Sequence, residues 1–301
     1  MPEQQEVYQN DKEDSVRDKS LLLGAHMSIA GGTPMALERA LQVESNVLQI
    51  FVKNNNRWEG KILLDEEVEL FRNSWTNSTI QEVVAHDSYL INLASPKNEL
   101  WIRSINALVE ELNRCERLGL SYLVAHPGAH VGSGEAEGIR RIAKALDQVH
   151  EKSGNINVKV ALETTAGQGS NIGYRFEHLR DILDICRYPE RVSVCVDTCH
   201  VFAAGYDIRE EKEYLRIMNR FDRVVGLDKV CLFHFNDSKR ELGSRVDRHD
   251  HIGEGKIGVN AFAFILNDSR FEDVPKILET PKGKTNREDR RNLELLRSLV
   301  Y

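Results

Sequence analysis

The sequence predicts a single-domain (β/α)8 barrel, and two observations carry this prediction. Eight short apolar segments rich in β-branched residues alternate along the chain with eight amphipathic segments of helical length. Once a polar N-terminal stretch is set aside, each strand and helix together occupy about 35 residues, as expected for β/α units. An open doubly wound sheet is the alternative, but the glycine-rich phosphate turn that normally follows its first strand is not found here.

The elements are expected in strict alternation. We expect strands at residues 21–27, 47–52, 82–90, 122–128, 158–164, 192–198, 231–237 and 276–280. We expect the helices that follow them at residues 33–43, 65–75, 98–118, 136–152, 175–187, 210–221, 259–266 and 287–300. In a parallel barrel, the carboxyl ends of all eight strands meet at one face, which is where such barrels build their sites.

The composition is that of a globular protein with a sizeable core, because 41% of the 301 residues are hydrophobic and 29% are charged. Residues 1–20 are polar and lack the apolar stretch of a secretory signal, so we expect a disordered tail followed by one barrel domain over residues 21–301. No apolar run is long enough for a membrane span. Five cysteines without a C-x-x-C motif favour reduced core thiols in the cytoplasm or nucleus.

Metal-ligand side chains end most of the expected strands. Read in order, the last residues are His26, Phe51, His86, His126, Glu163, Asp197, His234 and Glu279. Any one of these could be a single hydrogen-bonded polar residue at a strand end. For seven residues of metal-ligand type together, a shared metal site at the carboxyl face is the better interpretation.

Three further residues extend this set. His200 follows Asp197 by three positions and is expected on the turn after the strand, and Asp247 and His249 lie two apart on an extended loop. Imidazoles with carboxylates suit zinc, manganese or iron, and so many ligands exceed what one ion needs. The pattern therefore indicates a cluster of two or three ions sharing a bridging carboxylate, an arrangement suited to phosphoryl chemistry.

The same residues lie in blocks that resemble the signature blocks of the endonuclease IV family of apurinic/apyrimidinic endonucleases. These blocks are HDSYLINLAS (86–95), AHPGAH (125–130), ETTAGQGSNIGYRFEHL (163–179), CVDTCHVFAAGYD (195–207), HFNDSK (234–239), GSRVDRHDHIGEG (243–255) and ILET (277–280). The resemblance extends from about Leu23 to the last expected helix.

The resemblance implies three zinc ions per chain, with manganese as an alternative at one site. His86 and His126 would hold one ion, Glu163 would bridge it to a second, and a hydroxide between these two would attack phosphorus. Carried over position by position, the second ion is held by Asp197, His234 and Glu279, and the third by His200, Asp247 and His249. The catalytic residues would be Glu163 and Glu279.

The implied substrate is double-stranded DNA that contains an abasic site or a blocked 3′ end. Cleavage 5′ to the lesion would leave a 3′-hydroxyl and a 5′-deoxyribose phosphate, and blocked 3′ ends would be cleared. Tyr89 and Leu90 match residues that enter the DNA stack, although packing at the barrel rim is their simpler interpretation. The family's inserted arginine aligns with Asn56, next to Arg57, so it is open whether Arg57 takes that part.

The net charge of −7 argues at first against a nucleic-acid partner, but the six positive charges of three zinc ions would bring it to −1. Lys239 and Arg248 flank the expected site and could meet phosphates, or could simply belong to a solvated loop. A metal-dependent sugar isomerase or epimerase is the alternative enzyme, and a lesion-binding protein without catalysis is the other. We expect a monomer in the bacterial cytoplasm near the nucleoid, or in a nucleus, with no membrane partner.

Overall fold

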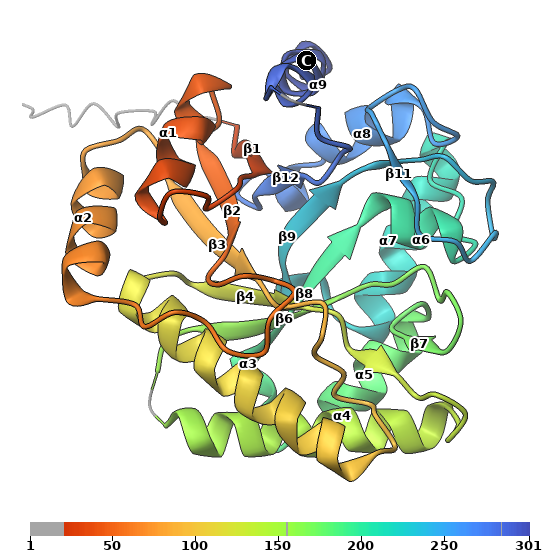
Figure 1. Ribbon diagram of the computed structural model, residues 1–301. Coiled ribbons are helices and arrows are strands. Elements are labelled where there is room, and N and C mark those ends of the chain that lie inside the picture. The colour runs from red at the N-terminus through yellow and green to blue at the C-terminus, as the bar shows by residue number, and fades with distance from the viewer. Residues whose placement is uncertain (1–20, 155, 284) are drawn as a thin grey trace, which may run out of the picture.

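The computed structural model describes residues 21–154, 156–283 and 285–301, and there eight parallel strands close into a barrel (Figure 1). Around the barrel the order is β1, β12, β9, β8, β6, β4, β3 and β2. Their bounds are β1 Leu23–His26, β2 Val47–Phe51, β3 Glu82–His86, β4 Tyr122–Ala125, β6 Lys159–Glu163, β8 Val192–Asp197, β9 Val230–Phe235 and β12 Lys276–Leu278. The predicted fold class is therefore confirmed, while the expected tail at residues 1–20 lies outside the described residues.

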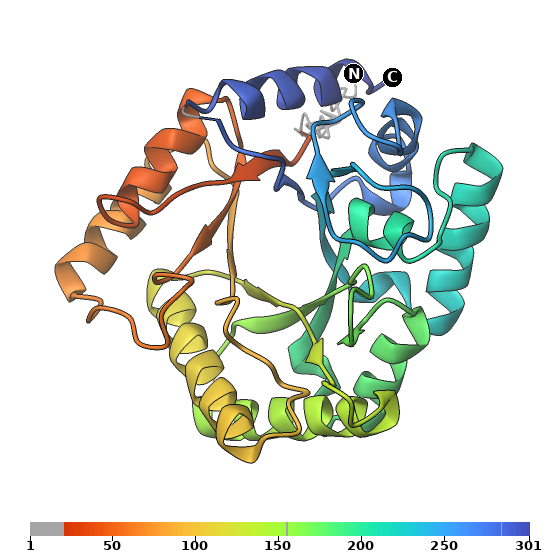
Figure 2. The ribbon, with the colours of Figure 1, turned by 45° about the vertical axis from the view of Figure 1, so that its right-hand side comes forward.

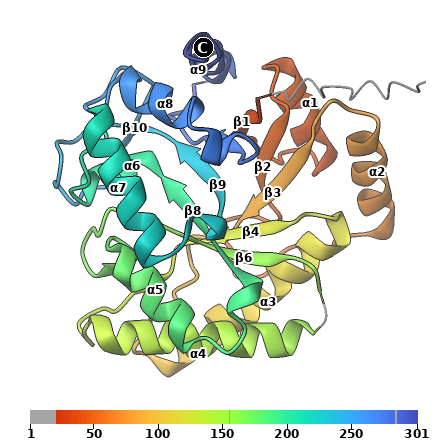
Figure 3. The same cartoon turned by 180° about the vertical axis from the view of Figure 1, so that it is seen from behind.

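Helices surround the barrel on its outside, as the views in Figures 2 and 3 show. They are α1 Pro34–Gln42, α2 Asp65–Thr76, α3 Asn98–Leu118, α4 Glu135–Ser153, α5 Phe176–Ile185, α6 Thr198–Ala203, α7 Glu211–Val224, α8 Val259–Leu266 and α9 Arg287–Ser298, with 3-10 turns η1 Pro189–Arg191, η2 Leu227–Lys229 and η3 Ser269–Phe271. All eight expected helices are present. Within the described residues, none of the helices is both long and apolar enough to cross a bilayer.

Short elements in the loops after the strands were not expected from the sequence. α6 begins immediately after β8, so His200 lies on the first turn of a helix and the expected simple turn is wrong. Two antiparallel pairs also form, β5 (Gly128–Ala129) with β7 (Asn171–Ile172), and β10 (Asp237–Ser238) with β11 (His249–Asp250). The third strand ends at His86, four residues earlier than predicted, because the Ser88 amide bonds to the Glu111 side chain on α3 and not to a neighbouring strand.

Side chains alternate between the two faces of each strand, and this alternation builds two cores. The larger cluster contains outward-facing strand residues such as Leu48 and Val83 packed against the helices. A separate cluster takes one residue from each of seven strands and fills the barrel interior with Val47, Val84, Val124, Ala161, Cys195, Leu232 and Ile277. The eighth strand supplies Gly24, where a Cβ would lie 1.8 Å from the Val47 carbonyl oxygen, so only glycine fits.

The next inward position on each strand lies two residues further on, toward the carboxyl end. These eight residues form what we call the polar ring: His26, Gln49, His86, His126, Glu163, Asp197, His234 and Glu279. Strand β2 ends at Phe51, as expected, but its residue in the polar ring is Gln49, which was not predicted. Phe51 lies one inward position beyond Gln49, and its ring packs 4.4 Å from the His26 ring and 5.6 Å from the Tyr89 ring, measured between centroids.

A buried histidine on α4 makes folding stability depend on pH. Among the described residues, neither ring nitrogen of His150 has a hydrogen-bond partner. Burial, with the nearby Arg191 charge, lowers the pKa of His150 to about 4. Because the unfolded chain then binds a proton more readily than the folded chain, we expect stability to be complete above about pH 6.5 and to fall as the pH drops toward 4.

The size of this effect is on the order of 3 kcal/mol between those two pH values. The measurement is the free energy of unfolding in urea from pH 4 to 8, compared between the native chain and His150→Leu. The variant should show a flatter pH dependence in this window. Parallel curves for the two proteins would contradict the assignment.

Candidate metal centre

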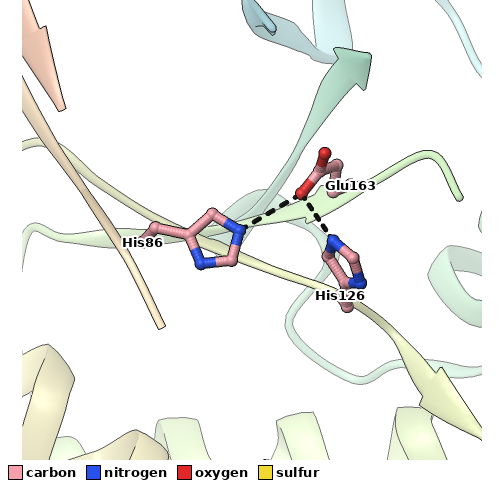
Figure 4. Close-up of side chains that lie close together, drawn as sticks. All are labelled: His86, His126 and Glu163. Carbon is pink, nitrogen blue, oxygen red and sulfur yellow. Dashed lines mark hydrogen bonds and ion pairs between the residues drawn. The ribbon is translucent and has the colours of Figure 1, made fainter. Parts of the chain in front are cut away.

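The carboxylate of Glu163, at the end of β6, lies at the centre of the polar ring. Its side chain is fully buried, and its two oxygens face different sets of histidines. Oε2 lies 3.3 Å from His86 Nε2 and 3.1 Å from His126 Nε2, as Figure 4 shows. We call His86, His126 and Glu163 the first group, and their facing atoms lie within 4.8 Å of one another.

The second group extends from the other oxygen of Glu163. Oε1 lies 3.0 Å from His234 Nδ1, which is itself 3.2 Å from Glu279 Oε2 and 3.9 Å from Asp197 Oδ2. Glu163, Asp197, His234 and Glu279 make up this group, and their facing atoms also lie within 4.8 Å of one another. Glu163 therefore belongs to both groups, one oxygen to each.

The third group combines His200 on α6 with the loop that carries Asp247 and His249. The Asp247 oxygens lie 3.2 Å from His200 Nε2 and 3.2 Å from His249 Nε2. Asp197 caps α6 by accepting a hydrogen bond from the His200 amide at 2.8 Å, which links the second group to the third. All nine predicted ligands therefore lie in one of three adjoining groups.

Hydrogen bonds fix which nitrogen each histidine presents. His86, His200 and His249 use Nδ1 to donate to the backbone carbonyls of Asp87, Thr164 and Glu279 at 2.9, 2.8 and 3.1 Å, so Nε2 is the nitrogen that faces the ligand groups. His234 is reversed, because its Nε2 bonds to Gln49 Oε1 at 2.8 Å and leaves Nδ1 facing the carboxylates. Metal-bound histidines are commonly oriented by such bonds from the second ring nitrogen.

The spacing within the groups is compatible with a shared metal ion. Two atoms that each lie about 2.0–2.1 Å from one zinc ion at a tetrahedral angle are ~3.3 Å apart. The closest contacts of all three groups, from 3.0 to 3.3 Å, approach this value. In the described part of the chain, the buried Nε2 atoms of His200 and His249 have no hydrogen-bond partner.

The electrostatics keep the Glu163 carboxylate ionised. Burial alone would raise the pKa of Glu163, but the charges of His234 and His126 lower it well below the ordinary value. Burial likewise works against the His86 cation, yet its hydrogen bond to Glu163 and the Glu279 charge raise the pKa of His86 to about 10. Such carboxylates attract cations, and a bound metal ion would displace the protons from the histidines.

Three residues that hold the groups in place were not predicted as functional. Gln49 donates to Glu279 Oε1 at 2.6 Å and to His26 Nδ1 at 2.9 Å while binding His234 through its carbonyl oxygen. Asn236 donates to Asp197 Oδ2 at 2.7 Å and accepts from the Glu279 amide at 2.9 Å. The signal for Gln49 was a polar residue at an inward position of an otherwise apolar strand.

The third, Asp237, orders the loop that follows the third group. Its buried carboxylate accepts from the backbone amides of Ser238, Gly253, Ile257 and Gly258 at 2.7, 2.9, 2.8 and 3.3 Å. The loop contains little regular secondary structure, and these bonds give its backbone amides the acceptors that a helix or strand would otherwise provide. The position of Asp237 directly after β9 was the available signal, but its partners on the loop lie 16 to 21 residues away.

The cysteines are free, as expected. Cys199 lies close enough to Asp197 and His249 to complete a further group, and Cys195 does so with Glu163 and His234. Burial is the main cause that raises the pKa of both thiols above the ordinary value, to about 12 for Cys199. Because a thiolate is the form that binds metal, imidazole and carboxylate remain the better ligands here.

The residues expected to contact DNA all lie on loops at the carboxyl face. Tyr89 is 67% exposed on the loop after β3, next to the partly exposed Leu90, and Arg57 is exposed on the loop after β2. Lys239 and Arg248 are exposed, and the Lys239 amide donates to the Arg248 carbonyl at 2.9 Å across the β10–β11 pair.

Comparison with known proteins first identifies the fold class to which the chain belongs. The model of the xylose isomerase-like TIM barrel family matches residues 37–299. A solved D-psicose 3-epimerase from Clostridium cellulolyticum has a TM-score of 0.63 over 92% of this chain and 99% of its own, but only 13% identity, so the two share the fold alone.

Two relatives make the family assignment more specific. A probable endonuclease 4 from Geotalea daltonii is 51% identical over 278 residues, which cover 92% of this chain and 98% of the relative. The crystal structure of endonuclease IV from Thermus thermophilus has a TM-score of 0.82 and 37% identity over 92% of this chain and 98% of its own. The chain belongs to the endonuclease IV family.

Gln49 offers a test of the polar ring that does not depend on activity. Gln49→Leu removes the bond that fixes His234 Nδ1 toward the second group. We therefore expect the affinity of the variant protein for zinc to fall about 10- to 100-fold. Competition between the protein and a zinc-binding dye measures this affinity. Gln42→Leu, the same change at the exposed end of α1, should leave the affinity unchanged. Equal affinities for native protein and Gln49→Leu would show that Gln49 does not orient a ligand.

Proposed function

We propose that this protein is a zinc-dependent DNA repair endonuclease that hydrolyses the phosphodiester bond 5′ to an abasic site. The products are a 3′-hydroxyl and a 5′-deoxyribose phosphate, and the same site clears blocked 3′ ends. The observation that carries the proposal is that two ligand groups share one carboxylate, Glu163, with a third group beside them, in a chain of the endonuclease IV family. The names of the relatives support an endonuclease, and the geometry supports a metal cluster.

In this proposal, the nine residues of the three groups hold three zinc ions, with manganese as an alternative at one site. Bound zinc supplies an activated water as nucleophile and stabilises the negative charge that develops on the phosphoryl oxygens. Glu163 and Glu279 are the catalytic carboxylates, because both face His234 Nδ1 at the shared centre, at 3.0 and 3.2 Å. Gln49 and Asn236 keep Glu279 oriented, so that little rearrangement is needed when substrate binds.

The loops at the carboxyl face would recognise the DNA. Lys239 and Arg248 carry positive charge beside the third group and would meet backbone phosphates, which position the duplex without reading its sequence. Tyr89 and Leu90 would enter the stack where the base is missing, and Arg57 would do so from the neighbouring loop. Removing an abasic nucleotide from the helix is cheap because its base pairing and stacking are already lost.

A sugar epimerase on the same barrel is the alternative enzyme, and the third group argues against it. His200, Asp247 and His249 form a site for which a sugar epimerase has no evident use. The relatives named as endonuclease 4 come from bacteria, and we propose that this chain acts as a monomer in the cytoplasm.

The direct test is cleavage of a duplex that contains one abasic analogue. We expect the zinc-loaded protein to cut the lesion strand once, 5′ to the analogue, and a chelator that removes zinc to abolish cutting. Glu163→Gln should lower the rate at least about 100-fold while the barrel stays folded, because the bridge is lost but the apolar interior layer is not.

The control is Glu151→Gln, an exposed glutamate on α4 far from the polar ring in the fold, which should cut at the native rate. Circular dichroism checks that both variants fold. An intact lesion strand after incubation with fully zinc-loaded native protein would refute the proposed activity. Native cutting by Glu163→Gln would refute the bridging role alone.

A further inference from the structure

A buried ion pair lies beneath two of the loops at the carboxyl face. Lys53 follows β2 and Glu111 lies on α3; their side chains are 2% and 1% exposed, and Lys53 Nζ is 3.2 Å from Glu111 Oε1. Removing two charges from water costs more than a single contact returns, so such a pair needs additional partners. Both residues have them: Lys53 Nζ also lies 3.5 Å from Glu110 Oε2 on α3, and the other partners are on the loops.

Each loop is tied to this pair by a backbone group. We name residues 53–58 the Arg57 loop and residues 87–91 the Tyr89 loop. Lys53 Nζ donates to the Trp58 carbonyl at 2.5 Å, which closes the Arg57 loop on itself. Glu111 Oε2 accepts from the Ser88 amide at 3.1 Å, which holds the start of the Tyr89 loop. The two oxygens of one carboxylate therefore hold two separate loops.

The loops are also joined to each other and to α3. The Ser88 hydroxyl donates to the Asn55 carbonyl at 2.7 Å, which links the two loops directly. On the outer side, the Arg103 guanidinium on α3 stacks on the Trp58 ring, 4.5 Å from its centroid. Neither Lys53 nor Glu111 belongs to the three ligand groups, but the network adjoins the first group, because Ser88 lies two residues after His86.

The exposed parts of the two loops carry the side chains proposed to enter DNA. Arg57 is exposed, and Tyr89 is 67% exposed with its ring edge against Phe51. The inner ends of the loops are fixed by buried groups while these side chains protrude. The spacing of the protruding side chains therefore depends on the contacts beneath them, which include the Lys53–Glu111 pair and the Ser88–Asn55 bond.

We propose that Lys53 and Glu111 are positioning residues that hold the Arg57 loop and the Tyr89 loop at the spacing required to enter a gap in damaged DNA. This inference rests on the proposed function, because it assumes that a lesion-containing duplex is the substrate. The pair acts on recognition of the duplex and not on the hydrolytic site. A displacement of about 1 Å in such a contact can cost about 100-fold in rate.

The variant to test is the double substitution Lys53→Met with Glu111→Gln. It removes both charges at similar volume, so no unpaired charge stays buried and the fold is retained. The Gln side chain can still accept from the Ser88 amide, but the tie from Lys53 to Trp58 is lost. The matched control is Arg216→Met with Glu213→Gln, an exposed ion pair of 2.6 Å on α7.

We expect the double variant to raise KM for the abasic duplex about 10- to 100-fold. Its zinc content, its melting temperature and its kcat on bis(p-nitrophenyl) phosphate, a small phosphodiester that needs no loop, should match those of the native protein. The fluorescence of 2-aminopurine opposite the lesion should report less insertion at saturating protein. The control pair should behave as the native protein in every assay.

The outcomes separate this inference from the proposed function. If the native protein leaves the abasic duplex uncut, the proposed function fails regardless of the variants. If the native protein cuts and the double variant has an unchanged KM, the positioning role is overturned. Loss of zinc, or an equal loss of activity on the small phosphodiester, would also overturn it, because the pair would then be supporting the fold as a whole.

Discussion

The two-residue alternation of side chains along eight parallel strands is the constraint on which the rest of the structure depends. It places an apolar layer inside the barrel and, one inward position further on, a ring of eight polar residues. The apolar layer closes the barrel below the ring, so the buried carboxylate of Glu163 has charged and polar neighbours on one side only. A fully buried glutamate is tolerated there because four histidine nitrogens lie 3.0–3.3 Å from its oxygens.

The same alternation explains which parts of the fold and site the sequence could predict. Strands of three to six residues that lead into a ligand type were recognisable because the inward position and the strand end nearly coincide. In β2 they do not coincide, since the strand continues to Phe51 after its inward residue Gln49. The last residue of β2 is therefore Phe51, and the polar residue Gln49 cannot be found by taking the last residue of each strand.

The loop elements were harder to predict for a different reason. α6 is only six residues long and wholly buried, so it shows no amphipathic period, and its start is visible only as the Asp197 cap. The β10–β11 pair is two residues on each side and depends on Asp237, whose partners are distant in sequence. Asp247 and His249 were still identified, because ligand chemistry and two-residue spacing are local properties.

We propose that different parts of this fold bind the metal ions and the DNA. The ends of the barrel strands position the ligands of the first and second groups, and α6 with one cross-linked loop adds the third group. The loops after β2 and β3 carry the exposed side chains and are tied to α3 by buried charges. A change in the loops can therefore alter which DNA is recognised without altering the cluster beneath them. The central claim is that the Glu163 carboxylate bridges two ions of a cluster of three.

This claim is tested most directly by a crystal structure of the zinc-loaded protein with anomalous diffraction measured on both sides of the zinc absorption edge. The account predicts three zinc peaks per chain, one in each group, with the two oxygens of Glu163 each about 2.0–2.2 Å from a different ion. A single peak, or two peaks with Glu163 bound to only one of them, would contradict it.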